Sequence, residues 1–130
     1  KIINAACRIS KGSDEILKLG NISIARDWGW APDFVHAMFK ILENDKPEDF
    51  VIATGKAITL EEFVRISFEH LNLDYKKYIQ IDKSLFRPDE LMYIKGNPVK
   101  ALKILGWKPT FYVEDVIKNM IEDELNSITV

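Results

Sequence analysis

Arg87 and Glu90 stand three residues apart in the stretch FRPDELMYIK, and together they could bind a phosphate and a pair of hydroxyls. A guanidinium donates two parallel, charge-assisted hydrogen bonds that match a phosphate. A carboxylate can accept hydrogen bonds from two vicinal hydroxyls. Pro88 fixes its own φ and disfavours helical geometry at Arg87, so the stretch is expected to be extended. A local ion pair of little energetic weight is the alternative.

Arg26 and Asp27 form a second polar cluster, which follows the alternating stretch 22–25. The end of a strand beside the start of a helix is a common ligand position in α/β folds. The alternative is that both charges pair with neighbours on the surface, as most charged side chains do. Trp28 and Trp30 are expected to pack rather than to stack on a base.

Several kinds of site are absent from the sequence. It contains no G-x-G-x-x-G fingerprint and no P-loop, and neither Tyr75 nor Tyr78 is followed by lysine four places on. No set of His, Cys and Asp has metal-ligand spacing, and His36 and His70 are expected on helix surfaces. The single cysteine, Cys7, excludes an internal disulfide, fits a reducing compartment and is expected to be a small packing residue.

The bulk composition indicates one globular domain. The chain has 130 residues, of which 47% are hydrophobic, enough for a real core. A net charge of −2 gives no electrostatic reason to bind nucleic acid or an anionic membrane. No apolar run approaches the roughly 20 residues that a membrane-spanning helix needs.

Helical spacing of apolar residues predicts helices at 32–44, at 59–72, between Asn97 and Gly106, and from Val113 to Leu125. The inward side chains are expected to be Phe34, Val35, Met38, Phe39 and Leu42 in the first helix, Leu60, Phe63, Val64, Ser67, Phe68 and Leu71 in the second, and Val113, Val116, Ile117, Met120, Ile121 and Leu125 in the last.

The ends of the middle two helices carry capping signals. Thr59 and Glu62 have the spacing of a capping box, in which each side chain satisfies a free backbone N–H. Asn97 is the expected N-cap of the next helix, with Pro98 at its first position and Gly106 as a left-handed C-cap.

Short strands are predicted between these helices. They are Ile16–Leu19, Ile24–Trp28, Phe50–Ala53 and Tyr78–Ile81. The run FVIA at 50–53 is continuously apolar, which is typical of a strand covered on both faces. FVIA and the YIQI of 78–81 are both expected to need a partner sheet. Strands alternating with helices favour an α/β fold.

The chain opens without a cap or a methionine. In KIINAACRIS, Ile2, Ala6 and Ile9 have helical spacing, as in the later part of a helix. The sequence is therefore expected to be the C-terminal part of a longer protein.

Three stretches, in order, resemble the C-terminal half of GDP-mannose 4,6-dehydratase. They are LGNISIARDWGWAPDFVHAM (19–38), DFVIATGKAITLEEFVRISFEHL (49–71) and FRPDELMYIKGNPVKALKILGWKP (86–109). This family belongs to the extended short-chain dehydrogenases/reductases and acts on a nucleotide sugar. The combination of motifs is specific, whereas LGWxP alone is shared with related nucleotide-sugar enzymes. Trp30, Pro32 and Asn97 depart from the family's usual histidine, lysine and aspartate.

The resemblance implies an α/β fold in which residues 1–130 are the C-terminal substrate-binding part. A Rossmann-type half outside this chain would bind NADP and carry all the catalytic residues. The KII that begins at Lys1 matches the Arg-Lys-Ile helix of the family. By this resemblance Lys1, Arg26 and Arg87 would contact the diphosphate of GDP-mannose, and Glu90 would accept hydrogen bonds from ribose hydroxyls. This chain would hold the substrate and break no bonds.

The resemblance also implies the reaction and the setting. GDP-mannose would become GDP-4-keto-6-deoxymannose with loss of water, through internal hydride transfer by bound NADP. The full enzyme would be a cytoplasmic homodimer or homotetramer, and this fragment alone would be inactive. The alternatives are a sister enzyme, such as a GDP-4-keto-6-deoxymannose reductase or a 4-epimerase, a non-catalytic sugar-nucleotide-binding module, or a degenerate partial copy.

Overall fold

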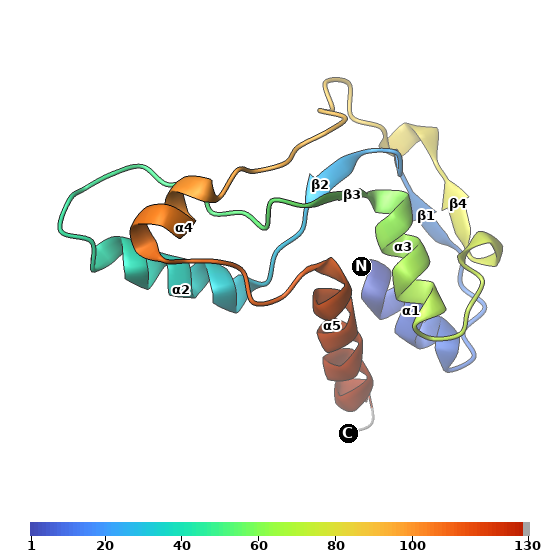
Figure 1. Cartoon of the computed structure of the whole chain (residues 1–130). Coiled ribbons are helices and arrows are strands. Elements are labelled where there is room, and N and C mark those ends of the chain that lie inside the picture. The colour runs from blue at the N-terminus through green and yellow to red at the C-terminus, as the bar shows by residue number, and fades with distance from the viewer. Residues whose placement is uncertain (129–130) are drawn as a thin grey trace.

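The computed structural model describes residues 1–128, which form helices joined by short strands. The α-helices are α1 (Ile2–Ser10), α2 (Ala31–Leu42), α3 (Leu60–Glu69), α4 (Val99–Leu105) and α5 (Val113–Ile128). The strands are β1 (Leu17–Leu19), β2 (Ala25–Asp27), β3 (Ala57–Thr59) and β4 (Ile79–Ile81), and the 3₁₀ turns are η1 (Tyr75–Lys77) and η2 (Lys83–Leu85). Helices α1, α3 and α5 gather at one end, α2 and α4 form an arm at the other, and β2 and β3 lie between (Figure 1).

The strands form two separate pairs. β1 runs parallel to β4, with Leu17 opposite Ile79. β2 runs antiparallel to β3, with Arg26 opposite Ile58. The strands predicted within 16–19, 24–28 and 78–81 are confirmed, each trimmed to three residues. The sequence did not predict β3, because its last residue, Thr59, is itself the cap of α3 and its three residues show no alternating pattern.

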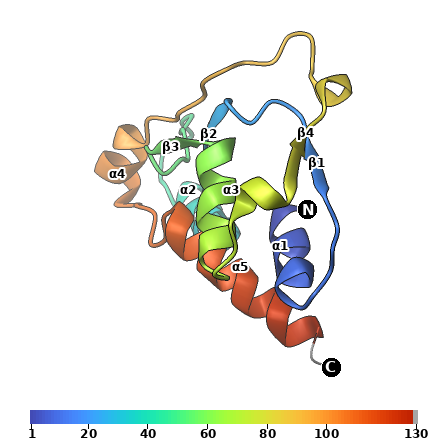
Figure 2. The same ribbon diagram turned by 90° about the vertical axis from the view of Figure 1, so that its right-hand side faces the viewer.

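The larger core lies among α1, α3 and α5, which pack against one another (Figure 2). Its buried side chains include Ile3, Cys7, Phe63, Val64, Phe68, Val113, Ile117 and Ile121. The inward faces predicted for the second and last helices are therefore largely confirmed, although Met120 is 41% exposed. Cys7 is fully buried, as expected of a packing residue.

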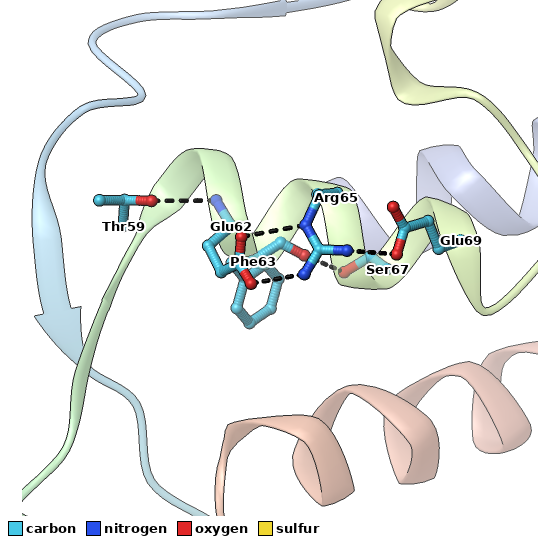
Figure 3. Close-up of polar contacts among 6 residues, drawn as sticks. All are labelled: Thr59, Glu62, Phe63, Arg65, Ser67 and Glu69. Atoms are coloured by element: carbon cyan, nitrogen blue, oxygen red, sulfur yellow. Dashed lines mark hydrogen bonds and ion pairs between the residues drawn. The ribbon is translucent and has the colours of Figure 1, made fainter.

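Helix α3 begins with only half of the predicted capping box (Figure 3). The Thr59 hydroxyl accepts from the Glu62 N–H at 3.1 Å. The Glu62 carboxylate does not return to the Thr59 backbone, since it accepts two hydrogen bonds from Arg65, which also pairs with Glu69. A bidentate, charge-assisted contact with arginine outcompetes one bond to a neutral backbone amide. The prediction of a reciprocal box was wrong for this reason.

Helix α2 presents its apolar residues differently from the prediction. Ala37 and Asp33 are buried, and Phe34 packs against the cluster formed with α4 and Trp107. The other residues expected inward are exposed, namely Val35 (50%), Met38 (61%), Phe39 (62%) and Leu42 (83%). Periodicity identified an apolar stripe correctly but could not tell which of two apolar sides meets a neighbour.

A buried carboxylate fixes the first turn of α2 to the loop before α5. Asp33 accepts from the Thr110 hydroxyl at 2.6 Å, from the Thr110 N–H at 2.8 Å and from the Phe111 N–H at 3.2 Å. The Trp107 indole N–H donates to the Asp33 carbonyl at 3.0 Å. These contacts satisfy a group that would be costly to bury alone, and they set the angle of the arm.

The run FVIA at 50–53 is not a strand in this structure, so that prediction was wrong. It is extended, but in the described part of the chain no strand lies beside it to exchange backbone hydrogen bonds. A strand is defined by its partner, and sequence pattern alone does not supply one.

Helix α4 starts one residue later than predicted. Pro98 is its N-cap, while the Asn97 side chain accepts from the Val99 N–H at 3.1 Å. Gly106 closes the helix with φ 61°, the left-handed conformation that the sequence predicted. Among the described residues, no helix has the length and apolar character needed to cross a membrane.

Candidate functional site

A cleft opens where β1 ends, between β2 and the segment after η2. Its volume is about 280 Å³, and it is lined by Gly20, Asn21, Ile24, Arg26, Trp28, Leu60, Leu85, Arg87 and Glu90. A second cleft is lined by Arg26, Arg87, Asp89, Glu90, Leu91 and Ile94. Three of the sequence-predicted site residues, Arg26, Arg87 and Glu90, line both. The first cleft is at or below the lower limit of small-molecule sites, so it can enclose only part of a nucleotide sugar.

Backbone pairing brings these distant residues together. The Ala25 N–H donates to the Met92 carbonyl at 2.7 Å, and the Ile94 N–H donates to the Ala25 carbonyl at 3.0 Å. The segment 92–94 therefore lies along β2 as a short parallel bridge. This pairing places Glu90, and the turn that carries Arg87, beside Arg26.

Arg26 is held in place by its own neighbourhood. Its Nη1 donates to the carbonyls of Ala25 and Leu91, both at 2.8 Å. Its Nη2 lies 3.6 Å from Glu90 Oε1, and the two side chains are 24% and 15% exposed. The guanidinium is therefore fixed in the wall of the cleft, and it links β2 to the segment that follows Glu90.

Arg87 differs from Arg26 in having no internal partner. Its side chain is exposed, and it makes no hydrogen bond or ion pair with residues 1–128. An anion could bind this guanidinium without breaking any contact within the described chain. Arg87 is thus the more available of the two arginines.

Lys1, the fourth predicted site residue, does not line either cleft. Its ammonium donates to the Lys18 carbonyl in β1 at 3.0 Å. Strand β1 leads directly to Gly20 at the cleft, so Lys1 contacts the chain two residues before the cleft begins. The structure brings three of the four residues together and leaves Lys1 apart.

Asp27 has a structural role that the sequence did not reveal. Its Oδ1 accepts from the Thr54 N–H at 2.9 Å and from the Thr54 hydroxyl at 2.6 Å. Its Oδ2 accepts from the N–H groups of Gly55, at 2.9 Å, and Gly96, at 3.3 Å. The alternative of casual surface pairing is therefore wrong for Asp27, because its carboxylate joins three segments of the chain.

Asn21 also lines the first cleft, although it is not among the site residues predicted from the sequence. Its Oδ1 accepts from the Ser23 N–H at 3.0 Å and from the Ser23 hydroxyl at 2.6 Å. A Cβ at neighbouring Gly20 would lie 2.9 Å from the Leu85 carbonyl oxygen, so only glycine allows this close approach. The signal was the Gly-Asn pair directly after a strand, which marks a turn but not a wall of a site.

Two further groups stabilise the walls. Trp28 packs on Phe63 with ring centroids 4.8 Å apart, as expected of a packing residue. The Trp28 indole N–H is buried without a hydrogen-bond partner in the described residues. Asp82 is the N-cap of η2, and hydrogen bonds from the side chain and backbone of Ser84 hold the pKa of Asp82 below its ordinary value. The ionised Asp82 carboxylate therefore stabilises η2.

Comparison with protein families and curated proteins gives a consistent result. A family model described as GDP-mannose 4,6 dehydratase matches residues 1–120. GDP-mannose 4,6 dehydratase 2 of Arabidopsis thaliana is 43% identical over 125 residues, covering 96% of this chain and 34% of the relative. The chain thus spans about a third of the length of that relative.

Solved structures show the same fold at low identity. RMD from Pseudomonas aeruginosa, complexed with NADPH, has a TM-score of 0.83 at 16% identity, covering 97% of this chain and 41% of that one. dTDP-glucose 4,6-dehydratase from Bacillus anthracis, in complex with NAD, has a TM-score of 0.79 at 18% identity, covering 98% and 39%. The predicted fold class, the α/β fold of an extended short-chain dehydrogenase/reductase seen in part, is confirmed.

Proposed function

The chain belongs to the GDP-mannose 4,6-dehydratase family, and on that basis we propose that it is the part of such an enzyme that holds the nucleotide of GDP-mannose. The observation that carries the proposal is the meeting of Arg26, Arg87 and Glu90 in one cleft. They come from segments more than sixty residues apart in the sequence. Two guanidiniums and a carboxylate are suited to a diphosphate and to vicinal ribose hydroxyls.

Each residue has a distinct part in this proposal. Arg87, without an internal partner, makes the main contact with the diphosphate. Arg26 faces the same charge with the donors that its carbonyl contacts leave over, and its ion pair with Glu90 orients that carboxylate toward the ribose. Lys1 contacts the diphosphate only if its ammonium first breaks its hydrogen bond to the Lys18 carbonyl, a requirement that Arg87 does not have.

The full enzyme would convert GDP-mannose to GDP-4-keto-6-deoxymannose with loss of water. The residues of this chain do not fit a dinucleotide: no glycine-rich loop links a strand to a helix start. We therefore place NADP and all bond-breaking groups in a half outside this chain, and we expect residues 1–130 alone to be inactive. Firm binding of the non-reacting GDP keeps the sugar in position, which is binding energy applied to orientation.

The cellular location and the oligomeric state of the full enzyme belong to the same proposal. The full enzyme is expected to be cytoplasmic and to form a homodimer or homotetramer. Sedimentation of the full enzyme would test the assembly, since a monomer at micromolar concentration would contradict it.

Calorimetric titration of this chain with GDP tests the site. We expect Arg87→Ala to weaken binding by about 1.5–3 kcal/mol, the usual value of a hydrogen bond to a charged group. Lys83→Ala is the matched control, because it removes the same charge from an exposed side chain four residues away. Equal losses of affinity in both variants would mean that only net charge matters, and the proposed contact between Arg87 and the diphosphate would be wrong.

A folded chain that does not bind GDP would also count against the proposal in its simple form. The same titration with UDP separates a GDP-specific site from a general nucleotide-sugar site. The arginines contact the diphosphate, which both ligands share, so a difference in affinity must come from the base. A clear preference for GDP supports the dehydratase assignment.

A further inference from the structure

The first cleft has a charged end and an apolar end. Arg26, Arg87 and Glu90 also line the second cleft, so they mark the end at which the two clefts meet. The other residues of the first cleft are Gly20, Asn21, Ile24, Trp28, Leu60 and Leu85. Their side chains are apolar apart from Asn21 and the indole N–H of Trp28, which is itself buried. This end suits a flat, uncharged ring, with a ribose and a diphosphate at the charged end.

The Asn21 side chain is the accessible polar group at the apolar end, and the turn that it closes fixes its orientation. Its amide accepts from the Ser23 N–H at 3.0 Å and from the Ser23 hydroxyl at 2.6 Å. A backbone N–H can only donate, so the atom that faces it must be the carbonyl oxygen of the amide. The NH₂ group of Asn21 is therefore directed away from Ser23.

That NH₂ group is not fully used within the described chain. It carries two N–H bonds, and its hydrogen-bond partner within residues 1–128 is the Met92 sulfur, at 3.6 Å. A thioether is a weak acceptor, and it engages only one of the two N–H bonds. At least one N–H of the Asn21 amide is thus available to a ligand in the cleft.

A group that offers only donors selects for acceptors on a nucleotide base. Guanine and hypoxanthine carry a carbonyl oxygen at C6, which accepts, whereas adenine carries an amine there, which donates. An amine opposite the Asn21 NH₂ group would leave two donors facing each other without an acceptor, at a cost in affinity. Uracil also carries an acceptor carbonyl, so this contact alone does not separate GDP from UDP.

We propose that the Asn21 NH₂ group donates to the exocyclic carbonyl of a keto base held between the apolar walls of the first cleft. The inference rests on the proposed function, because it takes Arg87 and Glu90 as the contacts for the diphosphate and the ribose. It adds the class of base to that function. A nucleoside diphosphate with a 6-keto purine binds more tightly than its 6-amino counterpart, and its carbonyl replaces the weak Met92 contact.

Inosine diphosphate and adenosine diphosphate test the proposal, because they match in size and charge and differ in the group at C6 and the proton on N1. Calorimetric titration of the chain is expected to show about tenfold tighter binding of inosine diphosphate, the effect of one hydrogen bond gained. Arg87→Ala should weaken the binding of both ligands and leave the ratio of their affinities unchanged, because they share the diphosphate.

Asn21→Asp exchanges the donor for an acceptor. The carboxylate keeps both contacts with Ser23, but its second oxygen stands where the NH₂ group was. The added negative charge weakens both diphosphates, so the ratio of the two affinities is the quantity to compare. We expect the preference for inosine diphosphate to disappear or to invert. Asn97→Asp is the matched control, because Asn97 also accepts from a backbone N–H, that of Val99 at 3.1 Å, and lines neither cleft.

Nuclear magnetic resonance of the isotope-labelled native chain gives a readout that needs no variant. The side-chain NH₂ protons of Asn21 should move downfield when inosine diphosphate is added and not when adenosine diphosphate is added. This observation keeps the proposal testable if Asn21→Asp does not fold, which circular dichroism would show.

Three results would overturn the proposal. Equal affinity of the native chain for the two ligands would reject the base contact, and the proposed function would stand if Arg87→Ala still weakened both. An unchanged ratio in Asn21→Asp, or an equal change in Asn97→Asp, would assign the preference to another group. A folded chain that binds neither ligand would contradict the base contact and the proposed function together.

Discussion

At the scale of single residues, the two arginines of the cleft have different structural roles. Arg26 bridges two backbone carbonyls and Glu90, whereas Arg87 makes no hydrogen bond or ion pair within residues 1–128. Lysine cannot reproduce the first role, because its single ammonium lacks the planar fork that spans several acceptors. At Arg26 the planar fork therefore matters for holding the backbone in place, whereas at Arg87 both the charge and the fork are available to the diphosphate.

We expect Arg26→Lys to loosen the segment 91–94 although it keeps the positive charge. GDP affinity should fall about tenfold, or about 1.4 kcal/mol, because Glu90 loses its orientation. Hydrogen exchange of 91–94 together with calorimetric titration would show both effects. Arg87→Lys serves as the comparison, since it should weaken binding without changing exchange. Unaltered exchange in Arg26→Lys would mean that the carbonyl contacts do not position the segment.

The chemistry of the cleft was only partly predictable from sequence. Arg87 and Glu90 are close neighbours in the chain, so their types alone suggested a joint role. Arg26 joins them across 64 residues through the pairing of Ala25 with 92–94, and local spacing cannot show such a contact. That connection came from the family resemblance. The contribution of Asp27 escaped both approaches, because its partners are backbone N–H groups that any sequence provides.

At the scale of elements, prediction succeeded where the signal is local. Helices α3 and α5 follow from 3.6-residue periodicity, and Gly106 ends α4 for a reason contained in its own backbone. Prediction failed where a neighbour decides. The run 50–53 has no strand beside it in the described residues, and four of the α2 residues expected inward are exposed. Both errors involve adjacent elements, for which tertiary neighbours and not local spacing decide the outcome.

The Asp27 carboxylate ties the end of β2 to the segments at 54–55 and at Gly96. Each of its oxygens accepts from at least one backbone N–H, so an amide in either orientation would direct an NH₂ group at a donor. We expect Asp27→Asn to lower the free energy of unfolding by about 1–3 kcal/mol, measured by urea denaturation. Asp45→Asn, an exposed position with the same charge change, is the control. Similar midpoints for both variants would show that the three segments are held by other contacts.

At the scale of the whole molecule, the chain has two unequal bodies. The helices α1, α3 and α5 bury most of the large side chains, while the arm of α2 and α4 has the small cluster of Ala37, Ala101, Leu105 and Trp107. Free energy of opening follows buried apolar contact, so the arm should open before the helical core.

Cys7 gives a direct way to measure this difference. Burial, and secondarily the Glu124 carboxylate, raise the pKa of the Cys7 thiol above its ordinary value, so the folded state disfavours the reactive thiolate. Alkylation in a urea series therefore reports opening of the helical core, because unfolding both exposes the sulfur and restores its acidity. Hydrogen exchange of α4 in the same series reports opening of the arm. We expect the α4 transition to come earlier, by about 1 M urea. If both probes shared one midpoint, the chain would be a single cooperative unit, and the separate stability of its two bodies would be wrong.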